Sequence, residues 1–126
     1  MNYLLDTNTI LYILKGKSKS LPFLKNDISI SFITKIELLS FNANPPESES
    51  INKILNNYEI IYIDNELIAK VIMIRKETGL KISDSIIVAT SLQQSSILVT
   101  SDLHVIKKAS KVGVSTFDTL TGKETK

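Results

Sequence analysis

The chain has 126 residues, 43% of them hydrophobic, and a net charge of +2 from 15 basic and 13 acidic residues. This composition fits one domain with a buried core and excludes a disordered chain. It contains no cysteine, which excludes disulfide bonds and thiolate metal sites. The longest apolar run has five residues, at 10–14, too short to span a membrane. The N-terminus shows no secretory signal pattern, so we expect a cytoplasmic protein.

Short apolar strands alternate with segments of helical periodicity along the chain. The residue patterns predict strands at 2–5, 28–32, 59–63, 97–100 and 114–117. They predict helices at 8–15, 34–41, 51–57, 65–78, 84–92 and 103–111. Between these elements we expect a polar turn at 16–20, a short helix or turn at 21–25, an exposed loop at 42–50 and a loose tail from 119 onwards.

Helix boundaries and inward faces follow from particular residues. Asn8 or Thr9 is expected to cap the first helix, Asp64 or Asn65 the fourth and Ser83 the fifth, and Gly79 is expected to end the fourth. In the second helix Ile36, Leu39 and Leu38 are predicted to face the core.

Five strands separated by helices predict an α/β fold with three layers, in which helices cover both faces of a parallel sheet. We expect one domain at 1–118, followed by a C-terminal tail at 119–126. Such sheets bind ligands at the carboxyl ends of their strands, where the strand order switches. The active edge should therefore follow the first and fourth strands.

Four acids fall on that predicted edge. Asp6 ends the first strand, Glu37 follows the second, Asp84 opens the fifth helix and Asp102 follows the fourth strand. Each also has a purely local interpretation: a capping box from Thr34 to Glu37, a first-turn acid at Asp84, an N-cap at Asp102 and a turn former at Asp6. Their shared position along one edge favours a common site.

Clustered carboxylates repel one another and lose ionisation unless a cation lies among them, and no lysine or histidine is obviously placed to neutralise these four. Oxygen-only ligands select hard cations such as Mg²⁺ or Mn²⁺. Two such ions can activate water and stabilise the leaving oxygen of a phosphodiester, so phosphodiester hydrolysis suits the cluster best. Outside the four acids the remaining charges sum to +6, which suits an anionic substrate but also describes an ordinary solvated lysine surface.

The chain resembles PIN-domain ribonucleases, and its short single-domain form resembles VapC-type toxins of toxin–antitoxin pairs. The resemblance covers nearly the whole chain. It rests on four motifs in order: Leu4-Leu5-Asp6-Thr7-Asn8, Thr34-x-x-Glu37-Leu38, Asp84-x-x-Ile87-x-Ala89 and Thr100-x-Asp102.

The resemblance implies a Mg²⁺- or Mn²⁺-dependent endoribonuclease that binds metal through Asp6, Glu37, Asp84 and Asp102. It also implies the strand order 3-2-1-4-5, a homodimer, a cognate antitoxin that blocks the site, and an RNA substrate of the tRNA class. Asn8 and Thr100 match polar positions that support the acids or the substrate phosphate in relatives. Some relatives carry a further acid soon after the last motif, where this chain has His104 and Val105.

Several polar residues admit two interpretations. His104, the only histidine, could act as a general base or lie exposed on a helix turn without a role. The lysines at 15, 17 and 19, and those at 107, 108 and 111, could follow an RNA backbone or be solvated surface residues. The four tyrosines show no base-stacking arrangement, and packing roles are expected for them.

Two other enzyme classes fit less well. A receiver domain needs an acidic pair after the first strand and a lysine after the fifth, but Asp6 has no acidic neighbour and Asp118 follows Phe117. A phosphatase with an Asp-x-Asp nucleophile has an acid where this chain has Asn8. The remaining alternative is a catalytically silent PIN-like module that binds RNA or protein.

Overall fold

The computed structural model describes residues 2–16, 27–41 and 43–126. Six strands and six helices are assigned within these residues. The strands are β1 (Asn2–Leu5), β2 (Asp27–Ser31), β3 (Glu59–Ile61), β4 (Ile97–Val99), β5 (Thr116–Asp118) and β6 (Lys123–Thr125). The helices are α1 (Thr7–Leu14), α2 (Phe32–Ser40), α3 (Pro45–Asn57), α4 (Asn65–Thr78), α5 (Ile82–Gln94) and α6 (Leu103–Lys111).

All the strands join one sheet in the order β3-β2-β1-β4-β5-β6. The pairs from β3 to β5 are parallel, which confirms the predicted fold class and the order 3-2-1-4-5. The sheet gains one strand that was not predicted, because β6 pairs antiparallel with β5. Residues 119–126 therefore do not form the loose tail that was expected.

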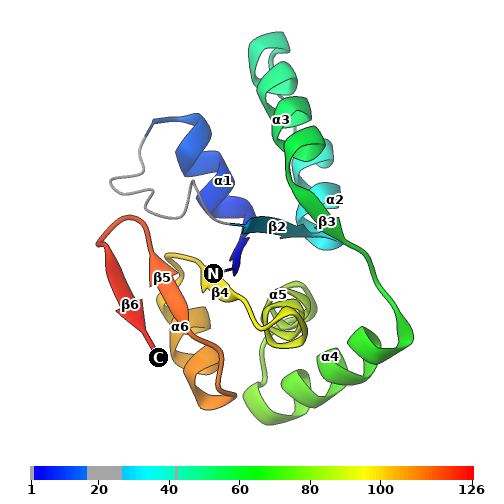
Figure 1. Cartoon of the computed structure of the whole chain (residues 1–126), viewed down its shortest axis with the longest axis vertical. Coiled ribbons are helices and arrows are strands. Elements are labelled where there is room, and N and C mark those ends of the chain that lie inside the picture. The colour runs from blue at the N-terminus through cyan, green and yellow to red at the C-terminus, as the bar shows by residue number, and fades with distance from the viewer. Residues whose placement is uncertain (1, 17–26, 42) are drawn as a thin grey trace.

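Consecutive residues of the central strand β1 belong to the two different sides of the sheet. Leu4 belongs to a core cluster with the buried residues of α4, α5 and α6, and Leu5 to a second cluster with those of α1, α2 and α3. This alternation is the period-two pattern of a strand covered on both faces. Figure 1 shows the resulting three layers, with α1 to α3 on one side of the sheet and α4 to α6 on the other.

Helix α2 begins earlier than predicted, and two of its three predicted inward residues are exposed. Ser31 is its N-cap and accepts a hydrogen bond from the Ile33 amide, so the predicted capping box from Thr34 is wrong. Leu38 is buried as predicted, but Ile36 and Leu39 are 52% and 56% exposed, so their predicted inward orientation is wrong. The second inward position belongs to the buried Thr34.

The next two helices begin with side-chain caps. Part of the predicted loop at 42–50 is helical, because α3 begins at Pro45 with a capping box between Asn44 and Glu47. The Asp64 side chain caps α4 as predicted, and Gly79 ends it in the left-handed conformation at φ 71°. The remaining predictions between β1 and β2, at 17–25 with Lys17 and Lys19, lie outside the described residues.

Helix α5 is the most deeply buried of the described helices. Its residues from Ser85 to Ser91 are buried, and hydroxyls inside it bond locally, as when Thr90 donates to the Ile86 carbonyl at 2.7 Å. Lys81, and not Ser83, is its N-cap residue, and no side chain caps it. None of the described helices combines the length and apolar character needed to cross a membrane.

Candidate active site

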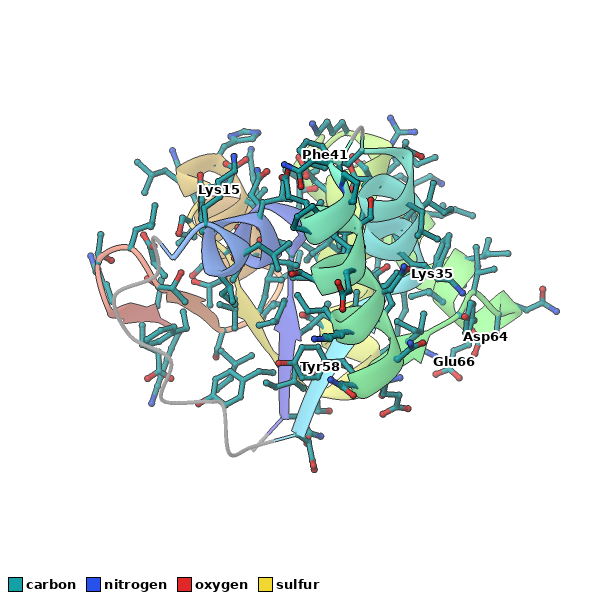
Figure 2. All side chains as sticks on the ribbon, turned by 90° about the horizontal axis from the view of Figure 1, so that it is seen from above. Lys15, Lys35, Phe41, Tyr58, Asp64 and Glu66 are labelled. Carbon is teal, nitrogen blue, oxygen red and sulfur yellow. The ribbon has the colours of Figure 1, made fainter. Side chains whose placement is uncertain are left out.

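The four predicted acids line one cleft at the carboxyl edge of the sheet, with a volume of about 130 Å³. In Figure 2 β1 points upwards, so this edge is uppermost, whereas Tyr58 lies towards the opposite edge. A larger hollow of about 400 Å³ lies at that opposite edge and includes none of the four acids. The cleft is lined by Asp6, Thr7, Asn8, Glu37, Lys81, Ser83, Asp84, Ile87, Asp102 and Val105.

Asp6 lies at the centre of this edge, because it directly follows the central strand β1 and is the N-cap of α1. Its amide donates to the Val99 carbonyl at 3.2 Å, which extends the ladder between β1 and β4. Its Oδ1 accepts from the Thr9 amide at 2.8 Å, so Asp6 is the cap that we had predicted at Asn8 or Thr9. The carboxylate is thus fixed by backbone contacts on both sides.

Burial raises the pKa of Asp6 above its ordinary value, and the negative charge of Asp102 raises it further. Hydrogen bonds from Thr100 and Thr9 act in the opposite direction and stabilise the charged form. Thr100 is fully buried and its Oγ1 also accepts from the Asp102 amide at 3.2 Å. This threonine therefore connects two of the acids.

Glu37 reaches the cleft from the second turn of α2 and is exposed. Thr7, at the start of α1, donates its hydroxyl to Glu37 Oε1 at 2.7 Å. The same hydroxyl lies 3.2 Å from Oγ1 of the buried Thr34. This chain of contacts orients a long, flexible side chain towards Asp6 without a charged partner.

Asp84 lies in the first turn of α5 and is half-buried. Burial raises its pKa; Lys81 lowers it, Asp102 and Glu37 raise it, and His104 lowers it. The four carboxylates are therefore electrostatically linked, because Asp102 raises the pKa of both Asp6 and Asp84, and Glu37 raises that of Asp84. Lys81 also corrects our expectation that no lysine is placed near the acids.

Asp102 is exposed and is the N-cap of α6. Its Oδ1 accepts from the amides of His104 and Val105 at 2.9 and 3.1 Å. Both of the hydrogen bonds found to this carboxylate in the described residues are thus made to the same oxygen. The Asp102 side chain therefore caps α6 and also lines the cleft.

The acidic side chains that line the cleft offer the oxygen ligands that a hard divalent cation binds. All four acidic groups are carboxylates, the oxygen donors that such a cation prefers. Burial is the largest cause that raises the pKa of Asp6 and of Asp84, and the neighbouring carboxylates add to it. The spacing is not that of a ready-made site: across the described part of the chain, no three acidic, histidine or cysteine side chains form a metal-binding group. Cation binding would require the carboxylates to draw closer together.

Sequence reasoning had missed Lys81 and Thr7 as members of the site. Thr7 stood inside a recognised motif but acquires its role only through Glu37, thirty residues away along the chain. Lys81 precedes the predicted start of the helix at residue 84, so no helical spacing signalled its position near Asp84. Asn8 is exposed and lines the cleft as expected.

The protein is thus of the three-layer α/β class, with a carboxylate cleft at the carboxyl edge of its sheet, where the strand order switches. The PIN domain model matches residues 3–112 of the chain. The protein therefore belongs to the PIN domain family. Comparison with curated proteins found no match.

The fold is similar to those of solved toxin–antitoxin complexes. DNA-bound VapBC from Salmonella typhimurium matches with a TM-score of 0.79 and 21% identity, covering 94% of this chain and 98% of that one. VapBC2 from Rickettsia felis, bound to a promoter DNA fragment, matches at 0.76 and 21% with the same coverage. A toxin–antitoxin complex from Klebsiella pneumoniae matches at 0.72 and 24%, covering 82% and 89%. At these identities the likeness establishes the fold.

Proposed function

We propose that this protein is a Mg²⁺- or Mn²⁺-dependent endoribonuclease that hydrolyses RNA phosphodiester bonds. The observation that carries the proposal is the convergence of Asp6, Glu37, Asp84 and Asp102 on one cleft of a PIN fold. Four carboxylates that line one cleft are suited to binding a hard divalent cation.

The surrounding residues keep these carboxylates in place and charged. Thr100 and Thr9 donate hydrogen bonds to Asp6, and Thr7 holds Glu37. Lys81 and His104 favour the charged form of Asp84. A divalent cation bound there would supply activation of water and stabilisation of the charge that develops on the leaving oxygen. Asn8, exposed at the rim, is available to the substrate phosphate.

Cleavage of labelled RNA, including tRNA, in Mg²⁺ or Mn²⁺ tests this proposal with two matched variants. Asp84→Asn removes one charge from the cleft and is expected to lower cleavage by at least about hundredfold, since carboxylates hold the cation that the chemistry needs. Asp64→Asn makes the same chemical change at the N-cap of α4, where asparagine caps equally well. That control should retain activity and stability. Full activity of Asp84→Asn would refute the mechanism.

The alternative, a catalytically silent PIN-like binding module, is favoured by one observation, the lack of a ready-made metal group in the described residues. The same assay separates the two functions. RNA binding without cleavage by the wild-type protein, at any concentration of Mg²⁺ or Mn²⁺, would support the silent module and contradict the nuclease.

We further propose that the protein is the toxin of a toxin–antitoxin pair and forms a homodimer. One of the solved structures that it resembles is described as a toxin–antitoxin complex, and two others are described as DNA-bound VapBC proteins. Exposed apolar side chains also support protein partners: Ile36, Leu39, Tyr62, Ile63, Ile68, Ile72 and Met73. Sedimentation of the purified chain should give a dimer. A small antitoxin-like reading frame is expected immediately upstream of its gene, and co-expression with that reading frame should give a complex that cleaves no RNA. A monomer, or a complex with full activity, would contradict these assignments.

A further inference from the structure

One face of α6 carries only basic side chains. His104 is three and four residues before Lys107 and Lys108, and Lys111 is four and three residues after them, so the four side chains share one side of the helix. This set is called the α6 basic face below. Val105 and Ala109 lie on the opposite, buried face of the helix. No acidic residue occurs in the sequence from 103 to 117. The helix therefore presents concentrated positive charge with no compensation from its own segment.

No described carboxylate neutralises these lysines. The ion pairs found in the described residues are Lys53–Glu49 and Lys70–Glu66, both on other helices. Lys111 is the largest cause that lowers the pKa of Lys108, and Lys107 adds to the effect. The three ammonium groups thus repel one another, and an anionic ligand would relieve that repulsion.

The α6 basic face begins at the active cleft. Asp102, which lines the cleft, is the N-cap of α6, and the charge of His104 acts on Asp84. At a rise of about 1.5 Å per residue, Lys111 lies about 14 Å along the helix axis from Asp102.

We propose that the α6 basic face binds the phosphate backbone of the RNA substrate and leads it from the helix end into the cleft. The proposal rests on the proposed nuclease function. A cleft with four carboxylates repels a polyanion, so a substrate strand needs a source of attraction at the rim. Lysines along a continuous surface provide it without reading sequence.

An acidic segment of a protein partner is the other ligand that this charge could attract. The position of the face favours RNA, because the charged row is continuous with the cleft in which cleavage is proposed.

The test uses two triple variants of the full chain that remove the same charge. Lys107→Gln/Lys108→Gln/Lys111→Gln alters the α6 basic face, and Lys53→Gln/Lys70→Gln/Lys76→Gln is the control on α3 and α4. Anisotropy of a labelled single-stranded RNA, measured in EDTA over a range of salt, gives binding without cleavage. The α6 variant should lose about tenfold or more in affinity, and its log–log salt slope should fall by about 2, or about 0.7 per lost contact. The control should lose much less.

In Mg²⁺ the α6 variant should keep its cleavage rate at saturating RNA, because these lysines do not touch the scissile bond. Equal affinity and salt slope for the two variants would overturn the proposal. So would normal RNA binding by an α6 variant that no longer binds its protein partner. Failure of the wild-type protein to cleave RNA would refute the nuclease function separately, since the binding readout does not depend on cleavage.

Discussion

At the scale of single residues, Asp6 is subject to opposing effects on its pKa. Burial and the neighbouring Asp102 raise its pKa, while Thr100 and Thr9 stabilise its charge. The fold therefore holds a carboxylate under conditions that disfavour its ionisation. Such a group costs stability in the absence of a cation and gains from one when it binds.

Asp6→Asn should therefore stabilise the metal-free protein at neutral pH. A carboxyl whose folded-state pKa is raised binds more protons folded than unfolded, so wild-type stability falls as pH rises from the ordinary Asp pKa through the raised value. The variant has no such loss and keeps its N-cap bond to Thr9. Urea unfolding in EDTA should show a more stable variant at pH 7 and little difference near pH 3. A variant that is less stable at both pH values by the same amount would contradict this account.

The acids of the site were predictable because each stands beside a local signal, a strand end or a helix start. Thr7 and Lys81 were not, since their roles depend on contacts made only after folding. Thr34 misled the prediction for α2 in a related way: the inward face holds a buried hydroxyl next to Thr7, while the apolar Ile36 and Leu39 are exposed. A prediction from hydrophobicity alone therefore placed Ile36 and Leu39 on the wrong side of α2.

At the scale of elements, α6 serves structure and site through the same residue. Asp102 caps the helix with one oxygen and lines the cleft. Two substitutions separate these roles. Asp102→Ala should lose activity and destabilise the protein by about 1 kcal/mol through the lost cap, whereas Asp102→Asn should lose activity at nearly unchanged stability.

Thermal unfolding and RNA cleavage of both variants measure these effects side by side. Equal stability of Asp102→Ala and the wild-type protein would show that the cap contributes nothing. Retained cleavage by Asp102→Asn would remove this carboxylate from the site.

Elements with strong local signals were predicted to the residue or nearly so. The strand β1 and the helix α6 match their predicted bounds, and α4 ends at Gly79 as its left-handed conformation requires. Boundaries without such signals were less accurate. Phe32 looks like the end of a strand but starts α2, and α5 starts without any side-chain cap. The strand β6 is short and polar, and only pairing with β5 makes it a strand.

At the scale of the whole molecule, the cleft exists because separate segments meet at one edge. Asp6 follows β1, Glu37 comes from α2, Asp84 from α5 and Asp102 precedes α6. The strand order β2-β1-β4 brings the carboxyl ends of these units together. No single segment holds more than one of the four charges, so cation binding should link the layers and stabilise the whole fold.

Titration of the metal-free protein with Mn²⁺ by calorimetry, with unfolding followed in parallel, tests the central claim most directly. The wild-type protein and Asp64→Asn should bind the ion and gain stability as its concentration rises, whereas Asp84→Asn should bind far more weakly and gain little. Equal Mn²⁺ binding by wild-type and Asp84→Asn proteins, or no binding by either, would contradict a metal site built from these four carboxylates.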